Sequence, residues 1–505
     1  MMPLSEMPNT LLSFMPTLFV WLLGLIFIAL VVTFIFDISQ SKNAILRNYP
    51  VVGHFRYLFS NLGEFFRQYF FAMDREEMPF NRAEREWVNH ASKGKENTIA
   101  FGSTKNLNVP GSIIFINCPF PTLNSDAVET RAVTIGDGYS DNPYVAKSIL
   151  NISGMSFGAI SKPAVLALSN GARMAGCWMN TGEGGLSPYH LEGGADLVFQ
   201  IGTAKYGVRN DDGSLNKDKL VKVAQHDQVK MFELKVSQGA KPGKGGILPG
   251  IKVTTEIAEI RGIPKGEDSI SPNRHIEVSN ASELLDMINR VRKITKKPVG
   301  FKTVIGHIRW LEALLAEVNK RGVDSAPDFI TVDGGDGGTG AAPMALMDNV
   351  GLPIKEALPM VVDKLMQHGL EDRIKVIASG KLITPADVAW AICAGADFVT
   401  SARGFMFSIG CIQSLKCNKN TCPTGITTHN KRLQKGLNPE SKAVKVRNYV
   451  NNITNTVETI AHSCGVKEVR MLNRTHVRIM QINGKSIPMN ELCPICNEGE
   501  MNESI

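Results

Sequence analysis

The chain has 505 residues, of which 43% are hydrophobic and 20% are charged, and its formal net charge is +7. This composition is typical of a globular protein with a substantial core and excludes an intrinsically disordered chain. The positive charge is modest and no basic run is present, so we expect no nucleic-acid partner. Nine cysteines, an odd number, favour a reducing compartment with metal or redox chemistry over a disulfide framework.

The segment from residue 11 to residue 36 contains no charged side chain. At about 1.5 Å per residue it is long enough to cross a hydrocarbon core of roughly 30 Å. Lys42, Arg47 and Arg56 follow it, so the positive-inside rule predicts a single-pass membrane protein with a cytoplasmic catalytic domain. A cleaved signal peptide and a buried core helix are the alternatives. The segment has neither the basic n-region of the first nor the polar face of the second.

The rest of the chain divides by composition. We expect a transmembrane anchor over residues 1–40, a juxtamembrane helical and connector region over 41–146, a catalytic domain over 147–430, and a C-terminal helical extension and tail over 431–505. Apolar residues recur at helical spacing over 51–73, with Arg56 and Arg67 among them. This helix could lie on the membrane surface or dock on the catalytic domain. A further helix is expected over 83–92.

From residue 147 onward, short apolar runs alternate with helical stretches. We predict eight strands over residues 148–152, 177–180, 196–201, 230–236, 298–304, 328–332, 374–378 and 397–401, with the best-marked helices over 162–175, 281–296, 308–321 and 385–394. This alternation implies parallel strands joined by helical crossovers, so we expect an α/β fold of the (β/α)8 TIM-barrel type. A doubly wound sheet is the alternative, but no G-x-G-x-x-G opens a helix after the first strand.

In a barrel the chemistry lies at the carboxyl ends of the strands. The first strand ends in SGMSFG, where Gly154 permits close approach of a flat ligand and Ser153, Met155 and Ser156 can line it. A tight turn alone would also explain this loop. Glu183 follows the second strand among glycines, which favours a contact with a substrate or cofactor.

Three lysines lie near the ends of strands four and five. Lys235 and Lys241 can hold an anion, although a solvated surface charge is the commoner role of a lysine. Lys302 lies inside an apolar strand, where a cation without a role would be costly. The Gly-rich insertion over residues 239–280 follows strand four and would cover this end of the barrel.

Glycine-rich loops follow strands six, seven and eight. Residues 333–340 read DGGDGGTG and can form a nest of backbone N–H groups for an anion. The loops after strands seven and eight are the usual phosphate site of a barrel, and Arg403 could add charge there. The candidate residues are Gly334, Gly335, Gly337, Gly338, Gly340, Ser379, Gly380, Arg403 and Gly404.

Cys411, Cys417 and Cys422 are spaced C-x5-C-x4-C-P after strand eight. Three soft thiolate ligands this close suit an iron–sulfur cluster, either a three-iron cluster or one with an open fourth site. Zinc with His429 as a fourth ligand, or three buried free thiols, are the alternatives. A separate C-x-x-C pair, Cys493 and Cys496, is either a redox pair, half of a zinc site or merely exposed.

The motifs MSFGAIS, NTGEGG, QGAKPGKGG, GGDGGTGAAP and C-x5-C-x4-C-P, in this order, resemble the FMN-binding synthase domain of glutamate synthase over residues 147–429. The resemblance implies a barrel that binds FMN and a 3Fe-4S cluster and reduces 2-iminoglutarate, formed from 2-oxoglutarate and ammonia, to L-glutamate. It implies Lys235, Glu183 and Lys241 as catalytic residues and the three cysteines as cluster ligands. The FMN contacts it implies are Ser153, Gly154, Met155, Ser156, Gln238, Lys302, Ser379, Arg403 and the loop glycines named above.

The chain departs from the large glutamate synthases of this family, which begin with a glutaminase domain and end in a β-helix. We therefore expect nitrogen to come from ammonia, another amine or a separate glutaminase subunit. No nicotinamide-binding motif is visible, so a ferredoxin-like donor or a reductase subunit would supply electrons. Lys235, Lys241 or Arg261 would bind the carboxylates of 2-oxoglutarate. The alternative is a membrane-anchored flavin and iron–sulfur protein that transfers electrons or acts on a different substrate.

Overall fold

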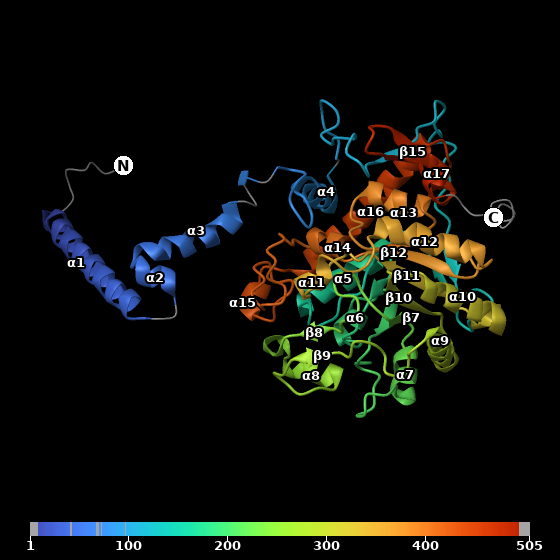
Figure 1. Cartoon of the computed structure of the whole chain (residues 1–505), viewed down its shortest axis with the longest axis horizontal. Helices are drawn as coiled ribbons and strands as arrows, with labels where there is room; N and C mark the ends of the chain where they lie inside the picture. Colours follow the sequence, from blue (N-terminus) through green and yellow to red (C-terminus); the bar gives the residue numbers. More distant parts are fainter. Residues whose placement is uncertain (1–8, 41–42, 67–69, 72, 96, 494–505) are drawn as a thin grey trace. The chain divides into compact units, whose positions relative to one another are not determined.

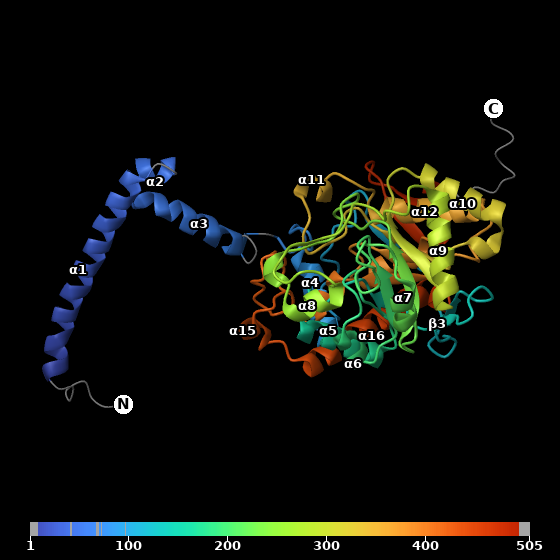
Figure 2. The same cartoon turned by 90° about the horizontal axis from the view of Figure 1, so that it is seen from below.

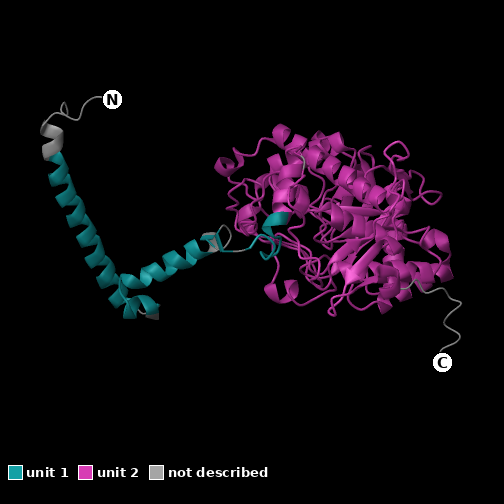
Figure 3. Ribbon diagram, turned by 90° about the horizontal axis from the view of Figure 1, so that it is seen from above, with its two compact units in different colours: residues 1–83 teal, residues 84–505 magenta. Residues whose placement is uncertain are grey.

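A computed structural model describes residues 9–40, 43–66, 70–71, 73–95 and 97–493. The chain forms two compact units, residues 1–83 and 84–505 (Figure 3). Arg67 of the predicted helix over 51–73, Lys42 and Cys496 lie outside the described residues.

The first unit consists of helices α1 (Asn9–Ser39), α2 (Ala44–Asn48) and α3 (Val52–Phe66), drawn in blue in Figure 1. Within α1, the stretch Phe14–Ser39 is long and apolar enough to cross a membrane. The buried carboxylate of Asp37 accepts hydrogen bonds from the Val51 N–H (2.8 Å) and the His54 ring (3.0 Å). These two bonds fix the turn from α1 to α3.

The second unit is built on a closed barrel of eight parallel strands, which confirms the predicted fold (Figures 1 and 2). All eight predicted strands are present. In barrel order they are β4 (Leu150–Ile152), β5 (Met179–Asn180), β6 (Leu197–Ile201), β7 (Val229–Lys235), β10 (Val299–Val304), β11 (Phe329–Asp333), β12 (Lys375–Ser379) and β13 (Phe398–Ser401).

Helices surround the barrel, and several are defined by clear end signals. Helix α5 (Lys162–Ala175) begins at Ser161, which caps Ala164, and ends at Gly176 in the left-handed conformation (φ 68°). Helix α13 (Pro385–Cys393) begins with a capping box of Thr384 and Asp387. The other outer helices are α6 (Pro188–Glu192), α7 (Lys217–Ala224), α9 (Ala281–Thr295), α10 (Arg309–Arg321), α12 (Ile354–Gln367) and α16 (Pro439–Ser463), which packs on α5 and α13.

The second unit also contains smaller elements outside the barrel strands. The insertion after β7 carries β8 (Ile247–Leu248), α8 (Thr255–Arg261) and β9 (Ser269–Ile270). Strands β1 (Ile113–Phe115), β14 (Val477–Met480) and β15 (Ser486–Pro488) form a separate antiparallel sheet that the sequence analysis does not predict. The remaining helices are α4 (Arg82–Ser92), α11 (Met344–Met347), α14 (Arg403–Ser408), α15 (Lys431–Gln434) and α17 (Met489–Leu492).

A hairpin closes the amino end of the barrel. Strands β2 (Val133–Ile135) and β3 (Tyr144–Ala146) pair antiparallel, and their side chains join the apolar core of the barrel. That core consists of Ile135, Tyr144, Ala146, Trp178, Val198, Met231, Phe329, Ile377 and Phe398. Trp178 lies edge-on to both Tyr144 and Phe398, with ring centroids 6.2 and 5.0 Å apart.

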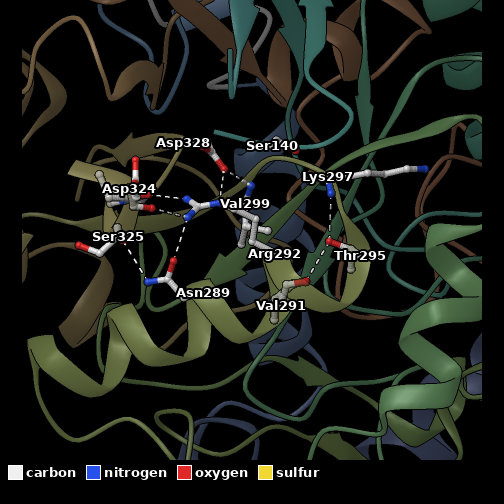
Figure 4. A network of polar contacts seen from close by, with 12 residues as sticks. Ser140, Asn289, Val291, Arg292, Thr295, Lys297, Val299, Asp324, Ser325 and Asp328 are labelled. Atoms are coloured by element: carbon white, nitrogen blue, oxygen red, sulfur yellow. Dashed lines mark hydrogen bonds and ion pairs between the residues drawn. The ribbon is translucent and has the colours of Figure 1, made fainter. Parts of the chain in front are cut away.

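A buried ionic network ties α9 to the start of β11 (Figure 4). The Nε of Arg292 donates to Asp328 over 2.9 Å, and its Nη1 donates to Asn289 over 2.9 Å (Figure 4). Arg373 adds a second ion pair to Asp328 at 3.0 Å, and the Val299 N–H donates to the same carboxylate over 2.7 Å. Two guanidinium groups therefore depend on one fully buried carboxylate.

We expect Asp328→Ala to lower the free energy of unfolding by about 3–5 kcal/mol, because it leaves both arginines buried without their counter-charge. Thermal unfolding of the full chain measures this loss. The matched control is Asp286→Asn, which removes an exposed partner of Arg321 and should cost less than about 1 kcal/mol. Equal effects of the two changes would contradict the role given to Asp328.

Candidate active site

A cavity lies at the carboxyl ends of the barrel strands. It is lined by residues from the loops after β4, β5, β7, β11, β12 and β13, and by the insertion that carries β8 and α8. Fifteen of the predicted site residues line it: Ser153, Gly154, Met155, Ser156, Glu183, Lys235, Gln238, Lys241, Lys302, Gly338, Gly340, Ser379, Gly380, Arg403 and Cys417. The topology of the barrel thus gathers residues that are far apart in the chain, from Ser153 to Thr427.

Four predicted glycines support the cavity without lining it. A Cβ atom at Gly334 would lie 2.7 Å from Asp336 Oδ1, and one at Gly337 would lie 2.9 Å from the Gly334 carbonyl oxygen. Side chains at Gly335 and Gly404 would overlap Gly351 and the Tyr449 hydroxyl, respectively. These glycines allow close packing of the loop backbones.

A group of cations surrounds one carboxylate in the cavity. Lys235 Nζ lies 2.8 Å from Glu183 Oε1, and both side chains are largely buried. Burial alone would raise the pKa of Glu183, but Lys235, Lys241 and Arg261 outweigh it and lower that pKa. Glu183 is therefore ionised, and three cations face a single negative charge.

Two glycines pack against Glu183. A Cβ atom at Gly202 would lie 2.6 Å from the Glu183 Cβ, and one at Gly246 would overlap its carboxylate. Gly246 belongs to the insertion after β7. The insertion therefore packs against the Lys235–Glu183 pair, and its residues form one wall of the cavity.

Lys302 enters the cavity from β10. Its Nζ lies 3.3 Å from Asp333 Oδ2 and 3.4 and 3.5 Å from the hydroxyls of Ser153 and Ser379. Asp333 also accepts the Gly239 N–H over 2.7 Å. The lysine is thus held between three strands in a largely buried position, as its place in an apolar strand suggests.

The glycine loops and the cysteine loop meet at Arg403. Its Nη2 donates to the Thr339 carbonyl oxygen over 2.6 Å, and its Nη1 lies 3.9 Å from Cys417 Sγ. Gln238 donates to the Thr339 hydroxyl over 3.0 Å. Gly380 adopts a φ of 122°, which a residue with a side chain rarely does, where its loop passes close to Gly334.

The three cysteines differ in their surroundings. Cys417 lines the cavity, and Lys252 donates from its Nζ to the Cys417 carbonyl oxygen over 3.3 Å. Burial raises the pKa of Cys411. Burial would do the same for Cys422, but hydrogen bonds from Thr424 and Thr427 outweigh it and lower its pKa. Positive charge and hydroxyl groups therefore surround the thiols.

Within the described part of the chain, no three His, Cys, Asp or Glu side chains converge to hold a single metal ion. His429, the fourth zinc ligand considered above, instead donates from its ring to the Gly158 carbonyl oxygen over 2.8 Å. A zinc site with this histidine has no support in this arrangement. The cysteine loop is tightly folded, because Gln413, Leu415 and Asn420 all adopt a positive φ.

The cavity also contains residues that sequence reasoning misses. Lys252 and Lys381 line it, as does Gln200 of β6. Lys252 lies in a short 3-10 helix of the insertion and Lys381 directly follows Gly380, so no sequence pattern distinguishes them from ordinary loop lysines. Gln200 is a polar residue within an otherwise apolar strand, LVFQI, and that contrast is a usable signal.

The fold and the cavity together define an α/β-barrel protein with a strongly cationic ligand site at the carboxyl ends of its strands, where barrel enzymes carry out their chemistry. A family model described as the conserved region in glutamate synthase matches residues 121–467. The chain belongs to the glutamate synthase family, and its relatives are oxidoreductases.

Individual relatives extend this result. The chain is 40% identical to the glutamate synthase large subunit-like protein YerD of Bacillus subtilis, over 94% of this chain and 98% of that one. It is 36% identical to an archaeal NADPH glutamate synthase of Methanocaldococcus jannaschii, over 66% of this chain and 63% of the relative. A glutamate synthase large subunit-like protein of Rhizobium meliloti is 31% identical, over 68% of this chain and 77% of that protein. The chain spans less than two thirds of the archaeal relative.

Proposed function

We propose that this protein is an FMN- and iron–sulfur-dependent oxidoreductase that reduces the imine of 2-oxoglutarate and ammonia to L-glutamate. The supporting observation is the site itself, in which Lys235, Lys241 and Arg261 face Glu183 in one cavity with the glycine loops and Cys417. Condensation of ammonia with the ketone releases water, and two electrons and two protons then complete the amine. Another amine in place of ammonia would leave this balance unchanged.

The residues that line the cavity are of the kinds that suit FMN. The Gly338–Gly340 and Gly380 loops offer backbone N–H groups, and Lys381 and Arg403 add positive charge for a phosphate. Ser153, Gly154, Met155 and Ser156 line the wall where the flavin ring would lie, and Gln238 and Lys302 supply polar contacts. FMN, when bound, supplies hydride transfer.

The cysteine loop fits a 3Fe-4S cluster in its donor set. In such clusters each thiolate binds a different iron, so the three sulfur atoms do not converge on one point as they would around a zinc ion. Cys411, Cys417 and Cys422 provide the three thiols, and Arg403 beside Cys417 favours negative charge there. The cluster, when bound, supplies one-electron transfer next to the cavity.

The substrate would be held by charge. Lys235 and Arg261 are fixed donors that suit the two carboxylates of 2-oxoglutarate, and Lys241 adds a third cation. Glu183 keeps the Lys235 ammonium in place through the 2.8 Å ion pair. Lys235 and Glu183 are largely buried, so little water screens these charges, which strengthens each contact.

The partners follow from the same chemistry. Electrons would come from a ferredoxin-like donor or a reductase subunit, and nitrogen from free ammonia or a separate glutaminase subunit. Helix α1 would anchor the protein in the membrane, with the barrel in the cytoplasm.

An absorption spectrum of the anaerobically purified protein tests the proposal. We expect flavin bands with a broad iron–sulfur shoulder, and reoxidation of the reduced protein only when 2-oxoglutarate and ammonia are both present. Both chromophores without reoxidation would contradict this substrate pair and favour another amine or an electron-transfer role. A protein without flavin would contradict the proposal as a whole.

The affinity for 2-oxoglutarate should depend on pH through Lys241. Burial and the neighbouring Lys235 lower the pKa of Lys241 to about 8. An anion binds the protonated form, so the contribution of Lys241 to binding is fully present well below pH 8 and is lost as the pH rises through 8. We expect the dissociation constant, measured by calorimetry, to increase roughly tenfold between pH 7.5 and 9.5.

Lys241→Arg is the matched variant for this prediction. Arginine keeps its charge throughout the range, so most of the pH dependence should disappear. An unchanged pH profile in this variant would show that another group, such as Lys252 with its pKa lowered to about 8 by burial, is responsible.

A further inference from the structure

A polar layer crosses the inside of the barrel directly beneath the cavity. Four strands, β5, β7, β11 and β13, contribute Asn180, Glu233, Thr331 and Thr400, all of them buried. These are alternate strands of the barrel, and in such layers branched apolar side chains normally predominate. The four residues line a small internal cavity.

This internal cavity lies next to the candidate active site. Ser153 and Lys302 line both the small and the large cavity. On its other side are apolar core residues, among them Trp178 and Phe329. The polar layer therefore forms the boundary between the sealed core and the ligand site.

Glu233 is the centre of the layer. Its Oε1 accepts hydrogen bonds from Asn180 Nδ2 (2.8 Å) and Gln200 Nε2 (2.6 Å), and its Oε2 accepts one from the Thr331 hydroxyl (2.6 Å). The oxygens of a carboxylate accept hydrogen bonds, and both amides turn their NH2 groups toward Glu233. Such charge-assisted bonds are stronger than neutral ones.

The amide oxygens consequently face away from Glu233. Asn180 Oδ1 accepts the Gly182 N–H over 2.9 Å. Beside the loop after β4, a Cβ atom at Gly154 would lie 3.0 Å from Asn180 Oδ1, and 3.1 and 3.3 Å from Gln200 Nε2 and Oε1. Gln200 also lines the active-site cavity. Because its Nε2 already donates to Glu233, the Gln200 Oε1 is the atom of this amide that can accept a hydrogen bond next to the wall proposed for the flavin ring.

We infer that Glu233 is a positioning residue that fixes the orientation of the Gln200 amide, so that the cavity floor offers an acceptor to a ring N–H of the flavin. This inference rests on the proposed binding of FMN. The oxidised flavin ring carries one N–H group between two carbonyl groups, and an amide turned the other way would place a donor where an acceptor is needed.

Glu233→Gln and Glu233→Met separate orientation from charge. In Glu233→Gln, the new amide oxygen can still accept from Asn180 and Gln200, and the new NH2 can donate to the Thr331 hydroxyl. This variant removes the charge and keeps the orientation. Glu233→Met removes both, and Gln200→Met removes the acceptor itself.

The experiment is a fluorescence titration of FMN into the deflavinated full-length protein and its variants. We expect Glu233→Met and Gln200→Met to weaken binding roughly tenfold, and Glu233→Gln to stay within about threefold of the unsubstituted protein. The double variant Glu233→Met/Gln200→Met should bind no more weakly than Gln200→Met, because Glu233 acts through Gln200. Thr400→Val, in the same layer, is the control and should bind normally, since its hydroxyl donates to the Ala378 carbonyl oxygen (3.5 Å) and not to Glu233 or Gln200.

Several results would overturn the inference. Equal weakening in Glu233→Gln and Glu233→Met would mean that charge, not orientation, is what matters. Additive losses in the double variant or a loss in Thr400→Val would also overturn it. Normal binding by Gln200→Met would overturn it too, and this variant can be tested even if Glu233→Met does not fold. If the unsubstituted protein binds no FMN, the proposed function fails together with this inference. If it binds FMN and the variants behave otherwise than expected, only the inference about Glu233 fails.

Discussion

Replacing Cys417 with serine is expected to give a protein that keeps its flavin and loses its iron–sulfur chromophore. A serine hydroxyl does not ionise near neutral pH and is a hard ligand, whereas iron–sulfur clusters are held by soft thiolates. Cys417 is the cysteine that lines the cavity and lies 3.9 Å from Arg403 Nη1. Its loss leaves only Cys411 and Cys422, which are too few for a three-iron cluster.

The measurement is iron content per chain together with the visible and electron paramagnetic resonance spectra, after anaerobic purification. Iron should fall to background, and donor-linked turnover should be lost with it. Cys118→Ser is the matched control, since Cys118 is a half-buried free thiol whose Sγ donates to the Phe120 carbonyl oxygen. Full iron content in Cys417→Ser, or equal loss in the control, would disprove the cluster assignment.

Lys302→Met should weaken FMN binding about 100-fold. Methionine has a similar length, so the change removes the charge from the cavity but little volume. Asp333 loses its ion pair with Lys302 and keeps the hydrogen bond from the Gly239 N–H. A hydrogen bond from a charged group contributes about 1.5–3 kcal/mol, and about 2.7 kcal/mol corresponds to 100-fold in affinity.

Titration of FMN into the deflavinated protein measures this loss. Lys375→Met provides the control, because Lys375 lies at the opposite end of β12 and donates to the Asp372 carbonyl oxygen at the surface. Lys302→Arg should recover part of the affinity by restoring the charge. The role of Lys302 would be refuted by a Met variant that binds FMN as tightly as the control.

The barrel could be predicted because its strands are buried on both faces. Strand β10, VGFKTV, is buried at all six positions and reads as a short apolar run, which is typical of a parallel strand between helices. Hairpin β2–β3 could not be predicted in this way. Its strands have three residues each, and their main stabilisation is the packing of Ile135 and Tyr144 into the barrel end.

The small sheet shows a second limit. Ile113 of β1 pairs with Ile479 of β14, which is far away in the chain, and no local sequence pattern predicts such a partner. Pairing of this kind depends on where the barrel brings the two segments. Propensity over a few residues carries no such information.

The site was predictable where a polar residue ends a strand. Lys235 and Glu183 follow this rule, and the structure places them 2.8 Å apart. Glu233 does not follow this rule, because it lies inside the strand VKMFELK, two residues before Lys235. The signal was present, since an acidic residue in a strand with two buried faces needs partners. Those partners, Asn180 and Gln200, come from two other strands.

The hairpin that seals the amino end of the barrel has a kinetic consequence. With Ile135, Tyr144 and Ala146 packed into the core, reactants and products exchange through the mouth at the carboxyl end. In the proposed reaction, L-glutamate must therefore leave before the next 2-oxoglutarate can enter. The product should act as a competitive inhibitor against 2-oxoglutarate, and solvent viscosity should slow turnover whenever release through this shared opening is the slowest step.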